Sequence, residues 1–119
     1  MSVRINNQLF SAEYMSTPDQ IQKGMMGRES LDGCMVFKMK KGHHTFWMQK
    51  CKIPLDIVFV LNNRINKIHR DCQPCMGDCP ERYSGMGDHV IEFPAGTTKD
   101  WKENDRVMMY LGTPLNPVR

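Results

Sequence analysis

Three of the five cysteines gather in the segment DCQPCMGDCP, where they are Cys72, Cys75 and Cys79. The two-residue gap between Cys72 and Cys75 has the spacing of a metal knuckle, and Cys79 offers a third thiolate. Structural zinc takes four ligands in a tetrahedron, so His69 or His89 would have to supply the fourth. Zinc modules usually carry two knuckles, and this chain shows one. The spacing leaves a zinc site, a disulfide and free thiols as alternatives.

Other reactive side chains form weaker patterns. Cys51 follows Lys50, and because a nearby cation lowers the pKa of a thiol, an activated Cys51 is one hypothesis. His43 and His44 are neighbours on an expected strand, where adjacent side chains point to opposite faces, so at most one faces inward. The chain contains no G-x-S-x-G pattern, which argues against a serine nucleophile.

Trp47 and Met48 stand between a histidine-rich turn and the segment IPLD at 53–56. A tryptophan in such a strand is ordinarily part of the core. Ligand sites combine aromatic side chains with a few polar groups, so the alternative is that Trp47 lines a pocket.

The N-terminal third predicts a hairpin followed by a helix. A turn at Asn6-Asn7 separates two extended segments. Thr17 is the expected N-cap and Pro18 the first helical residue, with a glutamine three residues after the cap. With Gly27 as the C-cap, the helix would cover about residues 18–27.

The remainder predicts short strands. They cover 34–39, 44–49, 55–61, 64–69, 89–93 and 106–111. Asn62-Asn63 is a strong signal for a tight hairpin. Strand 55–61 is apolar on both of its alternating faces, which predicts a central position in the sheet. A loop is expected over about 70–88, and a helical turn capped by Thr98 near 99–102.

Together these elements predict a mainly β (α+β) fold, a compact antiparallel barrel or sandwich with one short helix. At 119 residues the chain is expected to form a single domain over 1–119, with 112–119 as a surface tail.

The charge and hydropathy of the chain exclude several function classes. Sixteen basic and 13 acidic residues give a net charge of +3, without the basic stripe of nucleic-acid binders. The longest apolar run, 57–61, is far shorter than the ~18–20 residues of a membrane span. The first residues lack the apolar region of a signal peptide. We therefore expect a soluble protein, cytoplasmic as given, or exported if a leader has been removed.

Several sequence blocks occur in a distinctive order over about residues 12–110. They read GMMGR at 24–28, FWM at 46–48, IPLDIVF at 53–59, a PC…CP…YS loop over 74–84 and VIEFPAG at 90–96. The series resembles the motifs of the DUF192 family, also called UPF0127. This resemblance implies a compact β fold with one helix and no established reaction. Many members carry an export signal.

The resemblance also bears on the cysteines. The cysteine pair of the family loop matches Cys75 and Cys79, which implies a disulfide between them and leaves Cys72 as an addition. This chain has Lys50-Cys51 where the family has Asn-Thr, so any activity of that pair would be absent or altered here.

Four polar side chains fall inside the family blocks: Arg28, Asp56, Tyr83 and Glu92. Asp56 and Glu92 have apolar neighbours, so burying either one requires a partner, and an ion pair with Arg28 is the structural interpretation. The functional interpretation is a ligand face. Its members would be Arg28, Trp47, Met48, Asp56, Tyr83 and Glu92.

The expected function is a small binding or accessory module with a pocket near Trp47 and no established reaction. Its partner would be a small molecule or a glycan, without a cofactor, and the protein would be a monomer or a weak homo-oligomer.

Two alternatives involve chemistry. One is a hydrolase of a saccharide or peptidic substrate, with Asp56 and Glu92 as the acid/base pair, which requires carboxyl groups about 5–9.5 Å apart. The other is a small zinc protein. Its ligands would be His69, Cys72, Cys75 and Cys79.

Overall fold

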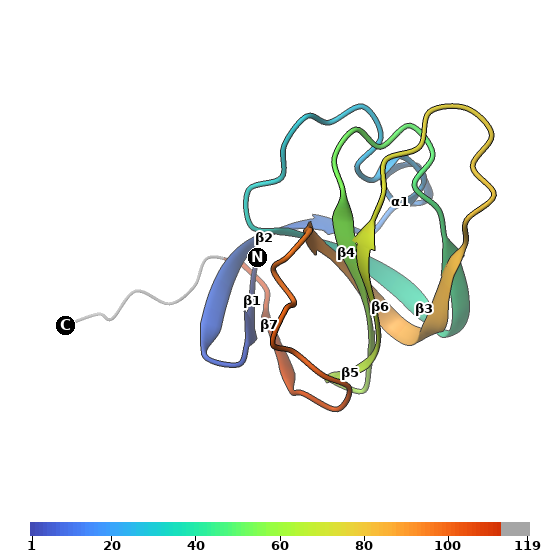
Figure 1. The fold of residues 1–119 in the computed structure, drawn as a ribbon. Helices are drawn as coiled ribbons and strands as arrows, with labels where there is room; N and C mark the ends of the chain where they lie inside the picture. Colours follow the sequence, from blue (N-terminus) through green and yellow to red (C-terminus); the bar gives the residue numbers. More distant parts are fainter. Residues whose placement is uncertain (113–119) are drawn as a thin grey trace.

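The computed structural model describes residues 1–112, so all but the first residue of the expected tail 112–119 lies outside the described residues. Within that range, seven strands and one helix are present (Figure 1). They are β1 (Ser2–Ile5), β2 (Gln8–Met15), α1 (Pro18–Lys23), β3 (Cys34–Phe46), β4 (Leu55–Leu61), β5 (Arg64–Cys72), β6 (Tyr83–Pro94) and β7 (Val107–Tyr110). The predicted mainly β class is confirmed.

The strands form one curled sheet in the order β5-β4-β6-β3-β2-β1-β7. Neighbouring strands are antiparallel except β2 and β3, which are parallel because α1 lies in the connection between them. The two end strands of the sheet, β5 and β7, approach each other at one end. There Ile65 N donates to Asp105 O at 2.9 Å, and the backbones of Arg64 and Arg106 form an antiparallel β-bridge. The sheet is therefore a half-barrel (Figure 1).

Both predicted hairpins are confirmed, and both turn on asparagine pairs. Asn6 and Asn7 have φ of 49° and 66°, and Asn62 and Asn63 have φ of 52° and 62°. Two successive left-handed residues are the signature of a two-residue type I′ turn, and asparagine tolerates that conformation better than most residues.

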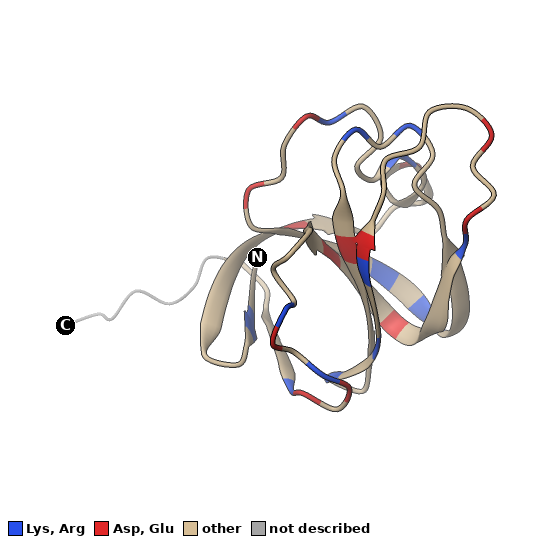
Figure 2. Ribbon diagram, viewed as in Figure 1, with Lys and Arg blue, Asp and Glu red and all other residues tan. Residues whose placement is uncertain are grey.

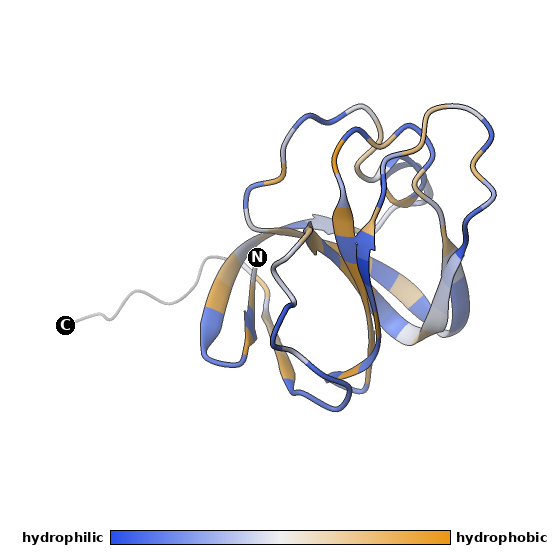
Figure 3. Ribbon diagram, in the orientation of Figure 1, coloured by the Kyte–Doolittle hydropathy of each residue, from blue (hydrophilic) through white to orange (hydrophobic). Residues whose placement is uncertain are grey.

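The two faces of the sheet carry separate hydrophobic clusters. The inner face holds Val58 and Val60 of β4 with buried residues from every strand but β2, whose Phe10, Ala12 and Tyr14 pack against the cluster while partly exposed. The outer face holds Leu55, Ile57 and Phe59 of the same strand, covered by α1 and the loops. Figure 3 shows the resulting mixture of hydrophobic and hydrophilic residues along the strands. As predicted, β4 is central and buried on both faces, between β5 and β6.

The helix begins where predicted and ends earlier. Thr17 and Gln20 form the expected capping box, with Gln20 N donating to Thr17 Oγ1 at 3.2 Å. The prediction of a helix reaching Gly27 was wrong, because Gly24 adopts φ of 45° and ends it. A Cβ at Gly24 would lie 3.0 Å from Phe37 Cζ, so the chain turns directly against the sheet there.

Three other predicted bounds were also wrong. Residues 34–46 form one strand rather than two, with a bulge between Lys38 and Gly42. The expected loop 70–88 shrinks to 73–82, because pairing with β4 and β3 extends β5 and β6. Residues 95–100 form turns, and 99–102 do not form the expected helical turn.

The six residues of α1 are too few to cross a membrane, and residues 1–112 contain no other helix. Lysine and arginine are interspersed with aspartate and glutamate over strands and loops in the view of Figure 2.

Candidate functional site

A pocket of about 220 Å³ opens beside Trp47, on the outer face of the sheet. The end of α1 and the turn after it, residues 21–26, form part of its lining. Strand β3 and the residue after it contribute apolar side chains: Phe37, Met39, Phe46 and Trp47. Thr45 and two buried residues, Cys51 and Glu92, complete the lining. The close approach of Gly24 to Phe37 holds these two walls together.

Glu92 is the unusual member of this pocket. It lies on β6 opposite Met35 and Ile57, and it is 4% exposed. Its Oε1 has no hydrogen-bond partner, a property shared within residues 1–112 only by the buried Ser2 Oγ. Burial raises the pKa of the Glu92 carboxyl from 4.5 to about 8. The group is therefore mostly neutral at pH 7, with an O–H to donate and an oxygen to accept.

Asp56 lies on the other face of the sheet and has a structural role. It is 1% exposed, and its Oδ2 accepts hydrogen bonds from Gly96 N (3.1 Å), Thr98 N (3.0 Å) and Thr98 Oγ1 (2.8 Å). Oδ1 accepts from Asp71 N at 2.9 Å. Asp56 pairs with Phe93, whereas Glu92 pairs with Ile57, so the two carboxyl groups project from opposite faces. The structure does not bring them together as an acid/base pair.

Arg28 pairs with a residue that sequence reasoning missed. Its two terminal nitrogens bind both carboxylate oxygens of Glu13, at 2.6 and 2.7 Å. The hydrogen bonds from Arg28 lower the pKa of Glu13 despite partial burial. The expected ion pair of Arg28 with Asp56 or Glu92 was wrong, and Arg28 is outside the pocket lining.

The rest of the expected ligand face is divided between two hollows. Trp47 is 39% exposed and lines the first pocket, and the Arg82 guanidinium carbon lies 4.7 Å from its ring centroid. Met48 and Tyr83 instead line a hollow of about 170 Å³ next to Cys75 and Cys79. Of the six residues, the structure brings Trp47 and Glu92 together in the first pocket.

Cys75 and Cys79 form a disulfide with Cα atoms 5.8 Å apart. Two of the four expected zinc ligands are thus bonded to each other. Cys72 is buried and donates to His69 O at 3.5 Å, while His69 Nε2 bonds Ser84 O at 2.8 Å. Over residues 1–112, no three histidine, cysteine or acidic side chains gather in metal-binding geometry.

The other thiols are not activated. Burial raises the pKa of Cys34 and Cys72 to about 12. Burial, with a contribution from Glu92, raises the pKa of Cys51 to about 11. The hypothesis of a Cys51 thiol activated by its lysine neighbour was wrong, because burial raises the pKa of Cys51 and no lysine contributes to lowering it.

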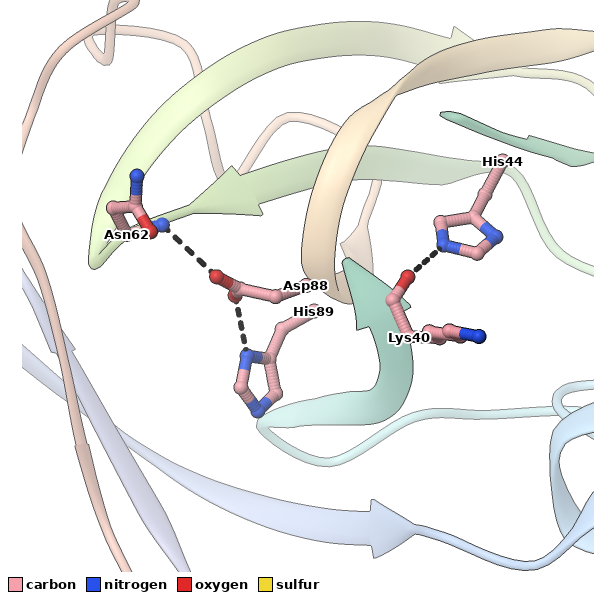
Figure 4. A network of polar contacts seen from close by, with 5 residues as sticks. All are labelled: Lys40, His44, Asn62, Asp88 and His89. Atoms are coloured by element: carbon pink, nitrogen blue, oxygen red, sulfur yellow. Dashed lines mark hydrogen bonds and ion pairs between the residues drawn. The ribbon is translucent and has the colours of Figure 1, made fainter. Parts of the chain in front are cut away.

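The histidines of β3 and β6 serve local contacts (Figure 4). His44 bonds the carbonyl of Lys40 across the bulge of β3. His89 Nδ1 bonds Asp88 Oδ1 at 2.8 Å, and Asp88 Oδ2 accepts from Asn62 N at 3.0 Å. These contacts join the β4–β5 turn to β6.

The model of the DUF192 family, described as "Uncharacterized ACR", matches residues 1–109. The chain belongs to the DUF192 family. The family resemblance of the sequence blocks is confirmed, and the match also includes β1.

Two crystal structures share the fold of this DUF192 domain. A protein of unknown function from Novosphingobium aromaticivorans DSM 12444 is 27% identical with a TM-score of 0.80, over 91% of this chain and 84% of that one. A "putative transcription regulator" from Sinorhizobium meliloti 1021 is 23% identical with a TM-score of 0.78, over 90% and 89%. At that identity the second likeness concerns the fold alone. No curated protein matches the chain.

Sequence reasoning missed most of the pocket wall in this DUF192 domain. Nothing in the spacing of Met26, Met39 and Phe46 distinguishes them from core residues. The available signal is the abundance of methionine, 11 of 119 residues, because flexible thioethers are common on adaptable binding surfaces as well as in cores.

The disulfide gives a first testable prediction. Breaking the Cys75–Cys79 bond of the DUF192 domain should lower the free energy of unfolding by about 2 kcal/mol, because so small a ring restricts the unfolded chain only modestly. Urea denaturation with and without a reductant measures the difference. The double variant Cys75→Ser/Cys79→Ser should not respond to reductant. An unchanged stability after verified reduction would contradict the prediction.

Proposed function

We propose that this DUF192 domain is a binding module for a small molecule, held in the pocket beside Trp47 with Glu92 as its polar anchor. The observation that carries the proposal is the buried carboxyl of Glu92, a residue of the pocket lining whose Oε1 has no hydrogen-bond partner. A buried polar atom left without a hydrogen bond costs about 1–3 kcal/mol, and natural proteins keep such features chiefly at functional sites.

The pocket restricts the ligand in size and character. Its volume of about 220 Å³ is below the range of drug-sized sites, about 300–1,000 Å³, so the ligand is small. Phe37, Phe46 and Met39 favour an apolar body. Glu92 provides one position for a polar group, which matches the usual composition of ligand sites, apolar walls with few polar contacts.

The geometry favours binding over hydrolysis. A carboxylate pair acting on a glycosidic bond must flank one cleft. Asp56 faces away from the pocket and accepts four hydrogen bonds, so among residues 1–112 the pocket lining offers Glu92 no second carboxylate with which to divide the roles of acid and base.

Filling the pocket tests the proposal. We expect small alcohols, amides and amines to shift the NMR signals of pocket residues and to raise the melting temperature by mass action. Met39→Trp should abolish these effects, because the larger side chain occupies the pocket. Met108→Trp, at an exposed methionine of β7 outside the lining, is the matched control and should bind as the wild type does. Equal binding by Met39→Trp, or no response from any compound, would contradict the proposal.

A further inference from the structure

The pocket of the proposed function combines a buried acid with electron-rich walls. Three aromatic rings, Phe37, Phe46 and Trp47, line it together with thioethers of the α1–β3 region. The faces of aromatic rings carry negative potential and attract cations, and the thioether sulfur is polarizable. Within residues 1–112 the lining contains one cationic side chain, the exposed Lys23.

We propose that the ligand of this pocket is a small organic ammonium ion, with its N–H groups on the Glu92 carboxylate and its alkyl part against the rings of Phe37, Phe46 and Trp47. This inference rests on the proposed function and names the ligand class of the same site.

Trp47 already interacts with a cation in this protein. The guanidinium carbon of Arg82 lies 4.7 Å from the ring centroid, within the distance of about 6 Å that defines a cation–π contact. Arg82 is not part of the pocket lining. The Trp47 ring therefore takes part in a cation–π contact in this fold.

The groups around Glu92 supply no competing charge from inside the sheet. Across β6 the neighbours of Glu92 are Met35 on β3 and Ile57 on β4, both apolar. Cys51 from the loop and Cys72 from β5 are close enough for Glu92 to influence their pKa values, and burial keeps both thiols neutral. From α1, Lys23 reaches the pocket from its exposed position. An entering ammonium ion is thus the partner that the carboxyl lacks.

Binding of a cation requires the carboxyl to ionise. In the protein without a ligand, Glu92 is mostly protonated at pH 7, because burial raises its pKa to about 8. The bound pair is a carboxylate with an ammonium ion, and the proton of Glu92 goes to the solvent. Affinity therefore rises with pH, by about tenfold from pH 6 to pH 7 and about fivefold from pH 7 to pH 8.

A matched pair of probes tests the charge requirement. n-Butylammonium has a pKa close to the value of about 10.4 for lysine, so it stays charged over this pH range. 1-Butanol has a similar size and a hydroxyl group but no charge. We expect titration calorimetry to show tighter binding of n-butylammonium. In buffers of different ionisation enthalpy at pH 7, it should also show release of about 0.9 proton per ion bound.

Three variants complete the experiment. Glu92→Gln keeps the shape of the side chain and should weaken n-butylammonium binding at pH 8 at least tenfold and remove its pH dependence, while 1-butanol binding changes less. Glu103→Gln removes the same charge at an exposed position outside the pocket and should behave as the wild type. Lys23→Gln removes the cation at the pocket and should tighten n-butylammonium binding.

The outcomes separate the two proposals. Binding of 1-butanol at least as tight as that of n-butylammonium, or binding of the ion without proton release, overturns the ammonium inference and leaves the binding module standing. Failure of both probes to perturb the pocket overturns the ammonium inference, and silence across the wider panel overturns the binding module. The proton count in the wild type decides the question even if Glu92→Gln does not fold.

Discussion

Between pH 5 and pH 8, the free energy of unfolding of the wild-type domain should fall by about 3–4 kcal/mol relative to that of Glu92→Gln. Burial holds the pKa of Glu92 at about 8 in the folded protein, against 4.5 without burial. Between these values the folded state keeps a proton that the unfolded state has released, so raising the pH favours unfolding. The stabilisation is complete below about pH 4.5 and is lost as the pH rises through about 8.

Urea denaturation of both proteins over this pH range measures the effect. The difference between the two curves isolates Glu92, because other shifted carboxyl groups, such as Glu13 bonded to Arg28 and Asp105 bonded to Asn6, are common to both proteins. Glu103→Gln should follow the wild type at each pH. Parallel curves for the wild type and Glu92→Gln would mean that Glu92 titrates normally in the fold.

Asp56→Ala is expected to lower the free energy of unfolding by about 4–5 kcal/mol. The substitution removes an acceptor of four hydrogen bonds, and it leaves the amides of Asp71, Gly96 and Thr98 without their partner. These amides belong to the end of β5 and to the turn after β6, so the carboxylate ties both segments to the start of β4. Hydrogen exchange at Gly96 and Thr98 should accelerate in the variant.

Two further variants provide an intermediate case and a control for this effect. Asp56→Asn retains one acceptor oxygen and should lose about half as much stability, which keeps the prediction measurable if the alanine variant does not fold. Asp100→Ala, at an exposed position of the same turn, should stay within about 0.5 kcal/mol of the wild type. Urea denaturation of the three variants tests whether the loss of stability decreases from Asp56→Ala through Asp56→Asn to Asp100→Ala. A loss below about 1 kcal/mol for Asp56→Ala would contradict it.

These two carboxyl groups show how burial on adjacent strands leads to opposite roles. Asp56 has its acceptor sites filled by the protein and serves the fold. Glu92 has an oxygen left unpartnered in a pocket, and the fold loses stability by retaining it. Protonating the Glu92 carboxylate is expected to stabilise the protein, whereas removing the Asp56 carboxylate is expected to destabilise it.

Local sequence signals predicted the elements that depend on neighbouring residues. The capping box of Thr17 and Gln20 fixed the start of α1, and two asparagine pairs fixed both hairpin turns. Alternation along 55–61 fixed the central, doubly buried strand. Predictions failed at element ends, such as the end of α1 and the joining of 34–46, because there contacts with distant strands extend or stop the element.

The candidate site was predicted in part. Trp47 and Glu92 were both named, and the structure brings them to one pocket. Arg28 was assigned the wrong partner, since Glu13 precedes it by 15 residues on β2 and no local pattern links the two. Arg82 on Trp47 and Thr98 on Asp56 were missed for the same reason: 35 and 42 positions separate the partners, so only the sheet topology joins them.

The sequence by itself determined the family, the β class, the turns and the residue types available for chemistry, because these depend on composition, periodicity and short motifs. The tertiary structure decided which carboxyl group is satisfied and which is left in a pocket. Asp56 and Glu92 are both acidic residues with apolar neighbours in their strands, and the sequence around them does not distinguish their roles. Strand register does, because a single step along paired strands exchanges the two faces of the sheet.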